Sequence, residues 1–360
     1  MGLIRVALAM AVLFGHLPII SVPFMNAGLA VQAFFIVSGY YMSLVLSGKY
    51  RDVGLFYSNR FLRLAPSYLA VMALSAIAVF GFNASATASA DTFALAFSNP
   101  MTALVMAFEN LAVLGQEMLF WFTIGDQGQL VFDASGALPA PPDVTVAWQA
   151  LLVPQSWSLS MEFMFYLIAP FLARLGWRTL AAIAAASMAL RLAGHALPVE
   201  YGIWQGRLFP TVLFLFVFGM LAHRAAPFAA KLPKAVGFVT AAILLALIIG
   251  LPHLHIQPEL SRWIMYVLIA LGIPFVFNAT KNIAIDRWIG DLSYPLYLTH
   301  LLVIGAVLTF NPPTPAWIAI GGSLALSVLI LVLIEHPVDR WRQRRVEKVA
   351  HRVAAAPATA

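Results

Sequence analysis

An arginine and a histidine lie eleven residues apart in the first apolar stretch of the chain, at Arg5 and His16. On a helix this spacing makes about three turns and about 16 Å, so both side chains lie on one face within about 20°. Because an ionisable group inside an apolar segment is costly, its default interpretation is functional. The pair suits an anion held by Arg5 and reactive chemistry deeper in, at His16. The structural alternative is a snorkelling arginine and a histidine hydrogen-bonded to a neighbouring helix.

A second basic pair, Arg60 and Arg63, lies in the segment NRFLRLAP (residues 59–66). Residues three apart share a helix face, and two guanidinium groups can bind phosphate oxygens bidentately. The pair therefore predicts an anion site at the membrane surface. The alternative is that the two charges only fix the orientation of the helix in the membrane.

Ser158, Glu162 and Tyr166 follow one another at intervals of four residues in a later apolar segment. This spacing places a carboxylate between a hydroxyl and a phenol on one stripe of a helix. A carboxylate inside such a segment needs a partner, most simply an arginine or a histidine.

Two further segments carry polar groups of the same kind. Ser293, Tyr297 and His300 share a helix face, and Glu335 closes the last apolar segment before His336. Each of these groups is also compatible with a structural role, as a hydrogen-bonding residue between helices. Together with the residues above, they predict a buried site with two histidines, two carboxylates and a basic mouth.

The composition is that of a membrane protein. Of the 360 residues 62% are hydrophobic and only 10% are charged, with a mean hydropathy of +0.88, whereas a soluble domain has about 25% charged residues. The chain has no cysteine, which excludes disulfides, a thiolate nucleophile and Cys-ligated metal. His253 and His255 form an HxH motif with only Glu259 nearby, so we expect no metal cofactor. In so apolar a chain, the net charge of +6 reports membrane orientation rather than nucleic-acid binding.

Ten apolar segments of about 20 residues are each long enough to cross a bilayer as a helix. They cover residues 3–20, 28–47, 64–82, 152–173, 179–197, 204–222, 236–252, 263–280, 288–310 and 316–335. We therefore predict an all-α polytopic membrane protein, a bundle of about ten transmembrane helices with both termini cytoplasmic. This orientation places eighteen of the 21 Lys and Arg residues inside and only Arg191, Arg207 and Arg262 outside, as the positive-inside rule favours.

Residues 83–151 contain no Lys or Arg, although residues 101–120 are apolar. A single crossing there would invert the charge distribution of every later loop. We therefore interpret 83–151 as an external loop with a re-entrant or interfacial helix. The remaining organisation is simple: residues 1–338 form one transmembrane domain, and residues 339–360 form a basic cytoplasmic tail.

Six motifs resemble, in order, those of the acyltransferase 3 family of integral-membrane acyltransferases. Arg5 and His16 match its first-helix pair, FFIVSGY (34–40) its FFxxSG(F/Y) and RFLRLAP (60–66) its RxxRLxP. WSLSME (157–162) with Phe165 and Tyr166 is similar to its WSLxxExxFY, SYPLYLTH (293–300) to its SYxxYLxH, and EHP (335–337) to its ExP. The resemblance extends over almost the whole chain.

The resemblance implies transfer of an acyl group, commonly acetyl, from cytoplasmic acyl-coenzyme A to a hydroxyl of a glycan, a polysaccharide precursor or another acceptor beyond the membrane. Arg5, Arg60 and Arg63 would then bind the phosphates of the donor. His16 would act as general base or acyl acceptor, and Glu162 would orient His16 or pair with an arginine. His300 and Tyr297 would donate hydrogen bonds to the thioester or the acceptor, with Ser158, Tyr166, Ser293 and Glu335 in orienting roles.

Two alternatives remain at this point. A proton-coupled transporter or flippase of a glycan or lipid-linked substrate would use the same buried charges as a proton relay, and a catalytically silent partner in polysaccharide biosynthesis would use them structurally. A phosphate site beside a histidine favours the enzyme, because a proton relay needs no phosphate site. The resemblance also implies a bacterial inner membrane as the location.

Overall fold

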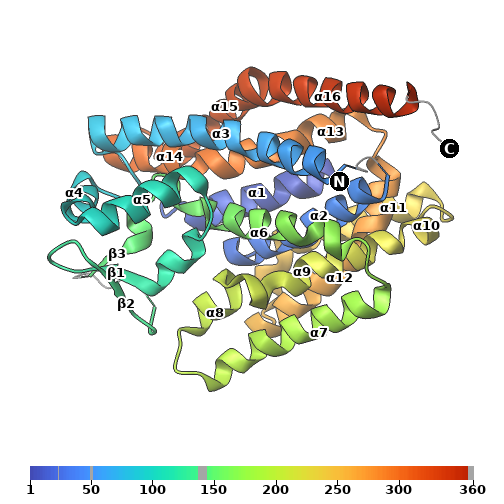
Figure 1. Cartoon of the computed structure of the whole chain (residues 1–360), viewed down its shortest axis with the longest axis horizontal. Coiled ribbons are helices and arrows are strands. Elements are labelled where there is room, and N and C mark those ends of the chain that lie inside the picture. Colours follow the sequence, from blue (N-terminus) through green and yellow to red (C-terminus); the bar gives the residue numbers. More distant parts are fainter. Residues whose placement is uncertain (23, 49–51, 137–143, 356–360) are drawn as a thin grey trace.

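The computed structural model describes residues 1–22, 24–48, 52–136 and 144–355. It is a bundle of α-helices whose axes run mainly along the long axis of the molecule (Figure 1). The chain start, α10 (Ala226–Ala229) and α13 (Ala284–Asp291) lie at one end, hereafter the N-terminal end; three short strands and α8 (Tyr201–Arg207) lie at the other, hereafter the strand end. The predicted all-α polytopic membrane fold is confirmed.

All ten predicted apolar segments contain helix. Their helices are α1 (Gly2–His16), α2 (Ala27–Gly48), α3 (Val53–Phe82), α6 (Trp157–Leu172), α7 (Trp177–Ala193), α8 with α9 (Phe209–Arg224), α11 (Lys234–Gly250), α12 (Pro258–Thr280), α14 (Ser293–Phe310) and α15 (Pro315–Ile330). Within the described ranges seven helices are long and apolar enough to span a bilayer, or eight if α8 and α9, bent by 41° at their break, form one span. The other two predicted spans are α1 and α6, with only 15 and 16 residues.

The centre of the bundle depends on a close approach of α2 and α9. A Cβ atom added to Gly39 would lie 1.9 Å from the carbonyl oxygen of Phe216, and one added to Gly219 would lie 1.9 Å from that of Ile36. Small residues allow such backbone contact between membrane helices. The contact fixes Ser38, which is adjacent to Gly39, in the wall of the cavity described below.

Replacing Gly39 by alanine should therefore push the two helices apart. We expect Gly39→Ala to cost about 1–3 kcal/mol, as overpacking does, and to lower the melting temperature of the protein in detergent by several degrees. Gly81→Ala on α3 is the matched control, because no atom lies within 4 Å of the added Cβ. Equal melting temperatures for the two variants would contradict the close-packing interpretation.

The segment between α3 and α6 forms a cap over the strand end. It comprises α4 (Ala90–Ser98), α5 (Pro100–Ala112), the 3-10 helices η1 (Gln116–Trp121) and η2 (Ala147–Ala150), and the strands β1 (Phe122–Ile124), β2 (Leu130–Phe132) and β3 (Thr145–Val146) in the antiparallel order β2-β1-β3. With 13 residues, α5 is too short to span. It exposes an apolar face at Met101, Leu104, Phe108 and Leu111, as an interfacial helix does.

Two carboxyl groups are buried in this cap, at Glu109 and Glu117. Burial, and next the charge of Glu117, raise the pKa of Glu109 to about 7, and burial likewise raises the pKa of Glu117. Because the pKa of Glu109 is higher in the folded than in the unfolded protein, the folded state loses stability as pH rises from about 4.5 to about 7.

Glu109→Gln removes this titration. We expect the variant to gain about 2 °C or more in melting temperature over the wild type at pH 8.5, and to gain less at pH 5, where Glu109 is largely protonated in the folded state. Asp126→Asn, at an exposed carboxyl of the same cap, makes the same change in net charge and should show no such pH-dependent difference. A gain that is equal at both pH values would show that the carboxylate of Glu109 carries no penalty.

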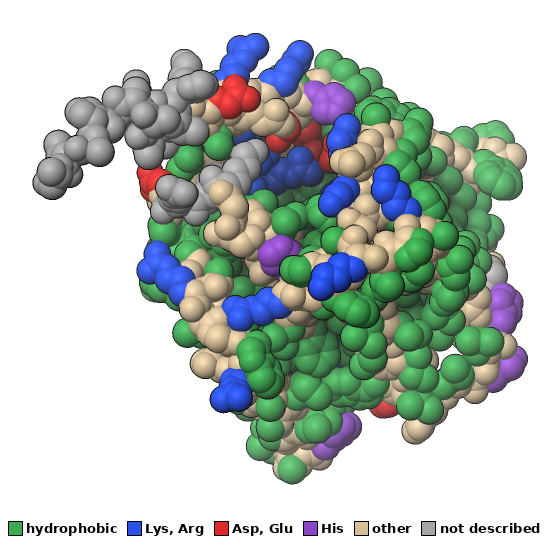
Figure 2. Space-filling view, turned by 90° about the vertical axis from the view of Figure 1, so that its right-hand side faces the viewer, with side chains coloured by type: hydrophobic (Ala, Val, Ile, Leu, Met, Phe, Trp, Pro, Cys, Tyr) green, Lys and Arg blue, Asp and Glu red, His purple; other side chains and the backbone are tan. Residues whose placement is uncertain are grey.

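Basic residues gather at the N-terminal end. The exposed residues of its loops and helix termini are Arg174, Arg178, Arg224, Lys231, Lys234, Lys281 and Arg287. Figure 2 looks onto this end and shows Lys and Arg side chains around a hollow in which acidic side chains are visible. The basic tail predicted from residue 339 onward is helical as part of α16 (His336–Ala355). Lys49, Arg51 and residues 356–360 lie outside the described residues.

Candidate active site

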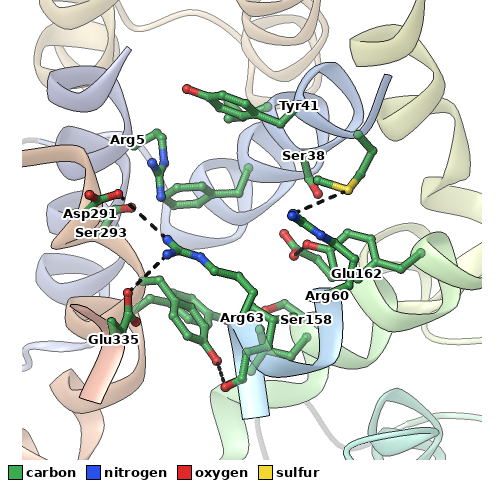
Figure 3. Close-up of a pocket in the computed structure, with 18 of the residues that line it drawn as sticks. Arg5, Ser38, Tyr41, Arg60, Arg63, Ser158, Glu162, Asp291, Ser293 and Glu335 are labelled. Atoms are coloured by element: carbon green, nitrogen blue, oxygen red, sulfur yellow. Dashed lines mark hydrogen bonds and ion pairs between the residues drawn. The ribbon is translucent and has the colours of Figure 1, made fainter. Parts of the chain in front are cut away.

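A cavity of about 360 Å³ lies near the N-terminal end of the bundle. Its walls come from α1, α2, α3, α6, the end of α13, α14 and the junction of α15 with α16 (Figure 3). Nine of the eleven predicted site residues line it: Arg5, Arg60, Arg63, Ser158, Glu162, Tyr166, Ser293, Tyr297 and Glu335. The two histidines, His16 and His300, do not.

Arg63 is held by two carboxylates. Its guanidinium nitrogens lie 3.6 Å from Glu335 Oε2 and 4.0 Å from Asp291 Oδ1, and Ser67 Oγ donates to Glu335 Oε1 at 3.2 Å. Glu335 ends a π-helical turn, η6 (Leu331–Glu335), a local irregularity that is frequent at functional sites. These contacts join α3, α13 and η6 around one partly buried guanidinium.

Arg60 lies on the opposite side of the same opening. Its Nη1 is 3.9 Å from Met42 Sδ and its guanidinium carbon is 5.9 Å from the centre of the Phe56 ring. Glu162 lies beside it and accepts a hydrogen bond from Tyr166, one turn further along α6 (Figure 3). Within the described residues, Glu162 has no hydrogen bond to His16; its surroundings are Tyr166 and the arginines.

The sequence predicts a basic mouth, but the mouth of the cavity carries charges of both signs. Four arginines line the cavity, and so do four carboxyl groups, those of Glu162, Asp291, Glu335 and Asp339. The arginines are Arg5, Arg60, Arg63 and Arg342. The reason is the cost of burying charge: a cation in a low-dielectric bundle needs a nearby anion when no ligand supplies one.

Ser158 and Tyr297 form the inner wall of the cavity. Their hydroxyl oxygens are 2.7 Å apart, and the Tyr297 hydroxyl also donates to the carbonyl of Gln155 at 2.7 Å. The ring centre of Tyr297 lies 5.9 Å from that of His300. The pair of hydroxyls therefore separates the arginine-lined cavity from the histidines.

His16 and His300 lie side by side beyond this wall, with ring centres 5.1 Å apart. His16 is at the last residue of α1 and is exposed, whereas His300 is fully buried. Each Nδ1 lies within hydrogen-bond distance of a backbone carbonyl, Val12 O at 2.8 Å for His16 and Tyr297 O at 2.7 Å for His300. A carbonyl only accepts, so each Nδ1 carries the proton and each Nε2 has a lone pair in the neutral ring.

The Nε2 atom of His300 is buried and has no partner within the described residues. An unpaired buried nitrogen is costly unless a ligand or water completes it. Two imidazoles with available lone pairs, close to a polar cavity but not part of its arginine cluster, can accept a proton or a covalently bound group.

Several cavity residues were not singled out from the sequence. Ser38 lies within the quoted FFIVSGY motif, and Asp291 directly precedes SYPLYLTH. Tyr294 donates to Leu64 O at 2.8 Å and so joins α14 to α3. Only the motif context of these residues pointed to them, because their spacing alone is ordinary. Among the described residues no group of three or more acidic or histidine side chains is arranged to hold a metal ion.

The chain matches a protein-family model described as an acyltransferase domain (acyltransferase 3) over residues 1–336. Neither the curated proteins nor the solved structures contain a significant match to the chain.

Proposed function

This chain belongs to the acyltransferase 3 family of membrane acyltransferases, and we propose that it transfers an acyl group, in the first instance acetyl, from acyl-coenzyme A to a hydroxyl of a glycan or similar acceptor. The donor binds from the cytoplasm and the acceptor from the opposite side of the membrane. The observation that carries the proposal is the arrangement of an arginine-lined cavity and a histidine pair on either side of one hydroxyl wall.

The cavity is the donor site in this proposal. Its volume, about 360 Å³, lies in the range of small-molecule pockets. It accepts the pantetheine arm and the acyl group, while Arg5, Arg60 and Arg63 bind phosphates near its mouth. Phosphate oxygens compete with Asp291 and Glu335 for Arg63, so donor binding is expected to loosen these two ion pairs.

The thioester must pass Ser158 and Tyr297 to reach the histidines. Their hydrogen bond is a local contact between two hydroxyls, which the thioester oxygen can replace by accepting from either one. In this way the wall becomes the oxyanion-stabilising part of the site. Tyr297 and Ser158 thus act as gate and as hydrogen-bond donors.

The chemistry needs one base with a free lone pair. His16 Nε2 takes the proton of the acceptor hydroxyl, the hydroxyl oxygen bonds to the thioester carbonyl, and the carbon–sulfur bond breaks. The CoA thiolate then takes up the proton from His16. In the covalent version, Nε2 of His16 bonds to the thioester carbonyl, the carbon–sulfur bond breaks and CoA leaves as the thiolate. The acceptor hydroxyl oxygen then bonds to the acyl carbon, the bond from that carbon to Nε2 breaks, and the hydroxyl proton passes to the CoA thiolate.

The decisive experiment is an acyl-transfer assay with purified protein in detergent. Radiolabelled acetyl-CoA is supplied with candidate hydroxyl acceptors, and CoA release and labelled product are measured. Acceptor-dependent release is expected. Folded protein that neither binds CoA nor releases it from acyl-CoA of any tested chain length would contradict the proposal, and vesicle uptake of labelled glycan would then test the transporter alternative.

Sidedness is tested separately, with reporter fusions in a bacterial inner membrane, the location we propose. Fusions near residues 50, 230 and 284 should report the cytoplasm, and fusions near 90, 135 and 256 should report the outside, because basic loops stay inside. A cytoplasmic report near 135 would mean that residues 101–120 span the membrane, and the proposed direction of transfer would then be wrong.

A further inference from the structure

One partly buried arginine, Arg207, lies at the strand end of the bundle and has no role in the mechanism above. The guanidinium carbon of Arg207 is 3.8 Å from the ring centre of Phe120 and 4.7 Å from that of Trp157. In the described part of the chain, no carboxylate lies within salt-bridge distance of it; Glu200, the acidic residue on the same segment, accepts instead from the backbone of Ile203. Arg207 is therefore a cation held by aromatic faces rather than by an anion.

The backbone at Arg207 is built to aim this side chain. Arg207 is the last residue of α8, at the 41° break before α9. The carbonyls that the break leaves without helical partners are bound by side chains: Thr211 donates to Trp204 O, and Arg191 donates to Gln205 O. Broken helices with satisfied carbonyls commonly line ligand sites in membrane proteins.

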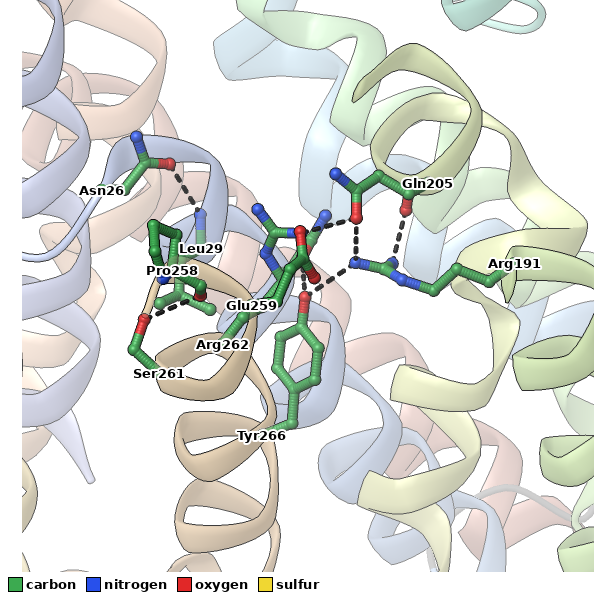
Figure 4. A network of polar contacts seen from close by, with 10 residues as sticks. Asn26, Leu29, Arg191, Gln205, Pro258, Glu259, Ser261, Arg262 and Tyr266 are labelled. Atoms are coloured by element: carbon green, nitrogen blue, oxygen red, sulfur yellow. Dashed lines mark hydrogen bonds and ion pairs between the residues drawn. The ribbon is translucent and has the colours of Figure 1, made fainter. Parts of the chain in front are cut away.

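A buried network fixes this break in place (Figure 4). Arg191, only 1% exposed, donates at 3.2 Å to both Gln205 Oε1 and the Tyr266 hydroxyl, and Arg262 also donates to Gln205 Oε1. Gln205 is two residues before Arg207. The network thus occupies the hydrogen-bonding groups of Arg191 and pairs Arg262 with Glu259, and it holds α8 while Arg207 stays outside it.

The position of Arg207 connects it to the proposed chemistry. Trp157, one of its two aromatic contacts, is adjacent to Ser158 of the hydroxyl wall. Ser158 in turn lies 2.7 Å from the Tyr297 hydroxyl, and the ring centre of Tyr297 lies 5.9 Å from that of His300. A ligand that touches Arg207 therefore lies next to the hydroxyl wall at the strand end, whereas the donor cavity lies near the N-terminal end.

We propose that Arg207 binds an anionic group of the acceptor, a carboxylate or a phosphate, and thereby selects acidic hydroxyl compounds such as sugar acids and sugar phosphates. This inference rests on the proposed acyl transfer only in identifying the ligand as the acceptor. The anion site itself is inferred from the guanidinium of Arg207, which has no carboxylate partner among the described residues. A guanidinium binds both kinds of anion bidentately. The two flanking rings, Phe120 and Trp157, are buried, and the low local dielectric that they create strengthens such a contact.

Arginine labelling of the wild-type protein tests the site without any variant. The protein in phosphatidylcholine nanodiscs is treated with phenylglyoxal, and labelling of Arg207 is read by peptide mass spectrometry. Glucuronate and glucose 1-phosphate should each slow the labelling at least about tenfold at saturation, while glucose should not. Arg262, which is paired with Glu259 at 2.7 Å, is the internal reference whose labelling should not change.

Variants of Arg207 measure how much this residue contributes to the affinity for glucuronate. Arg207→Gln should weaken glucuronate binding at least about tenfold, and Arg207→Lys should weaken it less. Glucuronate binding by each variant is measured twice, once without CoA and once with saturating CoA. Saturating CoA occupies the arginines of the cavity. CoA binding itself should be unchanged in both variants.

Three results would overturn the proposal: no protection of Arg207 by either sugar anion, undiminished glucuronate binding by folded Arg207→Gln, or protection by phosphatidylglycerol in the nanodisc instead of by the sugar anions, which would assign Arg207 to lipid. A failure of the proposed function would show in a different measurement, as wild-type protein that binds no CoA. Labelling protection at Arg207 does not depend on that result.

Discussion

Replacing His16 by glutamine is expected to reduce acyl transfer at least about 100-fold while leaving CoA binding within about twofold of the wild type. A general base contributes about 10²–10⁴-fold to rate, and a covalent acyl acceptor cannot be replaced by an amide. CoA binding survives because the cavity arginines lie near the other end of α1: Arg5 is about three helical turns from His16. Transfer and binding are measured on the same detergent-purified samples.

The geometry makes His300→Gln the essential companion variant. The ring centre of His300 is 5.1 Å from that of His16, and His300 Nε2 is buried without a partner in the described chain. If His16→Gln transfers at the wild-type rate while His300→Gln does not, the base is His300. If both variants keep full activity, neither histidine is the base and the mechanism is wrong. His253→Gln, at an exposed residue of the strand end, controls for loss of a histidine as such.

Wild-type transfer should also rise with pH over the range in which imidazole loses its proton, because only the neutral ring has a lone pair on Nε2. The Arg207→Lys variant, which keeps the charge near His16, should show the same profile. A rate that falls as pH rises through neutrality would require an acid, not a base, in the rate-limiting step.

Much of the donor cavity was predictable because its residues obey helical periodicity. Ser158, Glu162 and Tyr166 lie on one stripe of α6, and all three line the same cavity. Helical spacing reports the face of a single helix. It does not report which faces meet, so neither the contact of His16 with His300 nor the ion pairs of Arg63 with Glu335 and Asp291 followed from it.

Two features escaped prediction for other physical reasons. Arg207 lies inside the apolar segment 204–222 and was counted only as an outer charge, although an arginine within such a segment is itself a signal of function. The hydropathy profile does not reveal the break between α8 and α9 that positions Arg207. The reason is that side chains stabilise this bend within one apolar segment. The predicted spans at residues 3–20 and 152–173 are shorter as helices than as apolar segments, because α1 has 15 residues and α6 has 16.

The second large effect is expected at the donor arginines. Arg60→Ala should weaken CoA binding about 10- to 100-fold, which corresponds to the about 1.5–3 kcal/mol of a hydrogen bond to a charged group. Binding is measured by calorimetry on folded protein. Arg178→Ala, which removes an exposed charge stacked on Trp177 at the same end of the molecule, should bind CoA as the wild type does.

Arg63 should behave differently from Arg60, because it also neutralises two carboxylates. Arg63→Ala leaves Glu335, 5% exposed, without its cation, so we expect lower thermal stability as well as weaker CoA binding. Adding Glu335→Gln removes the uncompensated charge and should restore stability but not binding. Arg63→Lys should recover stability more than binding, since an ammonium can balance a carboxylate but cannot reproduce the bidentate fork. If the double variant regains both properties, the function of Arg63 is structural, and Arg5 and Arg60 alone hold the phosphates.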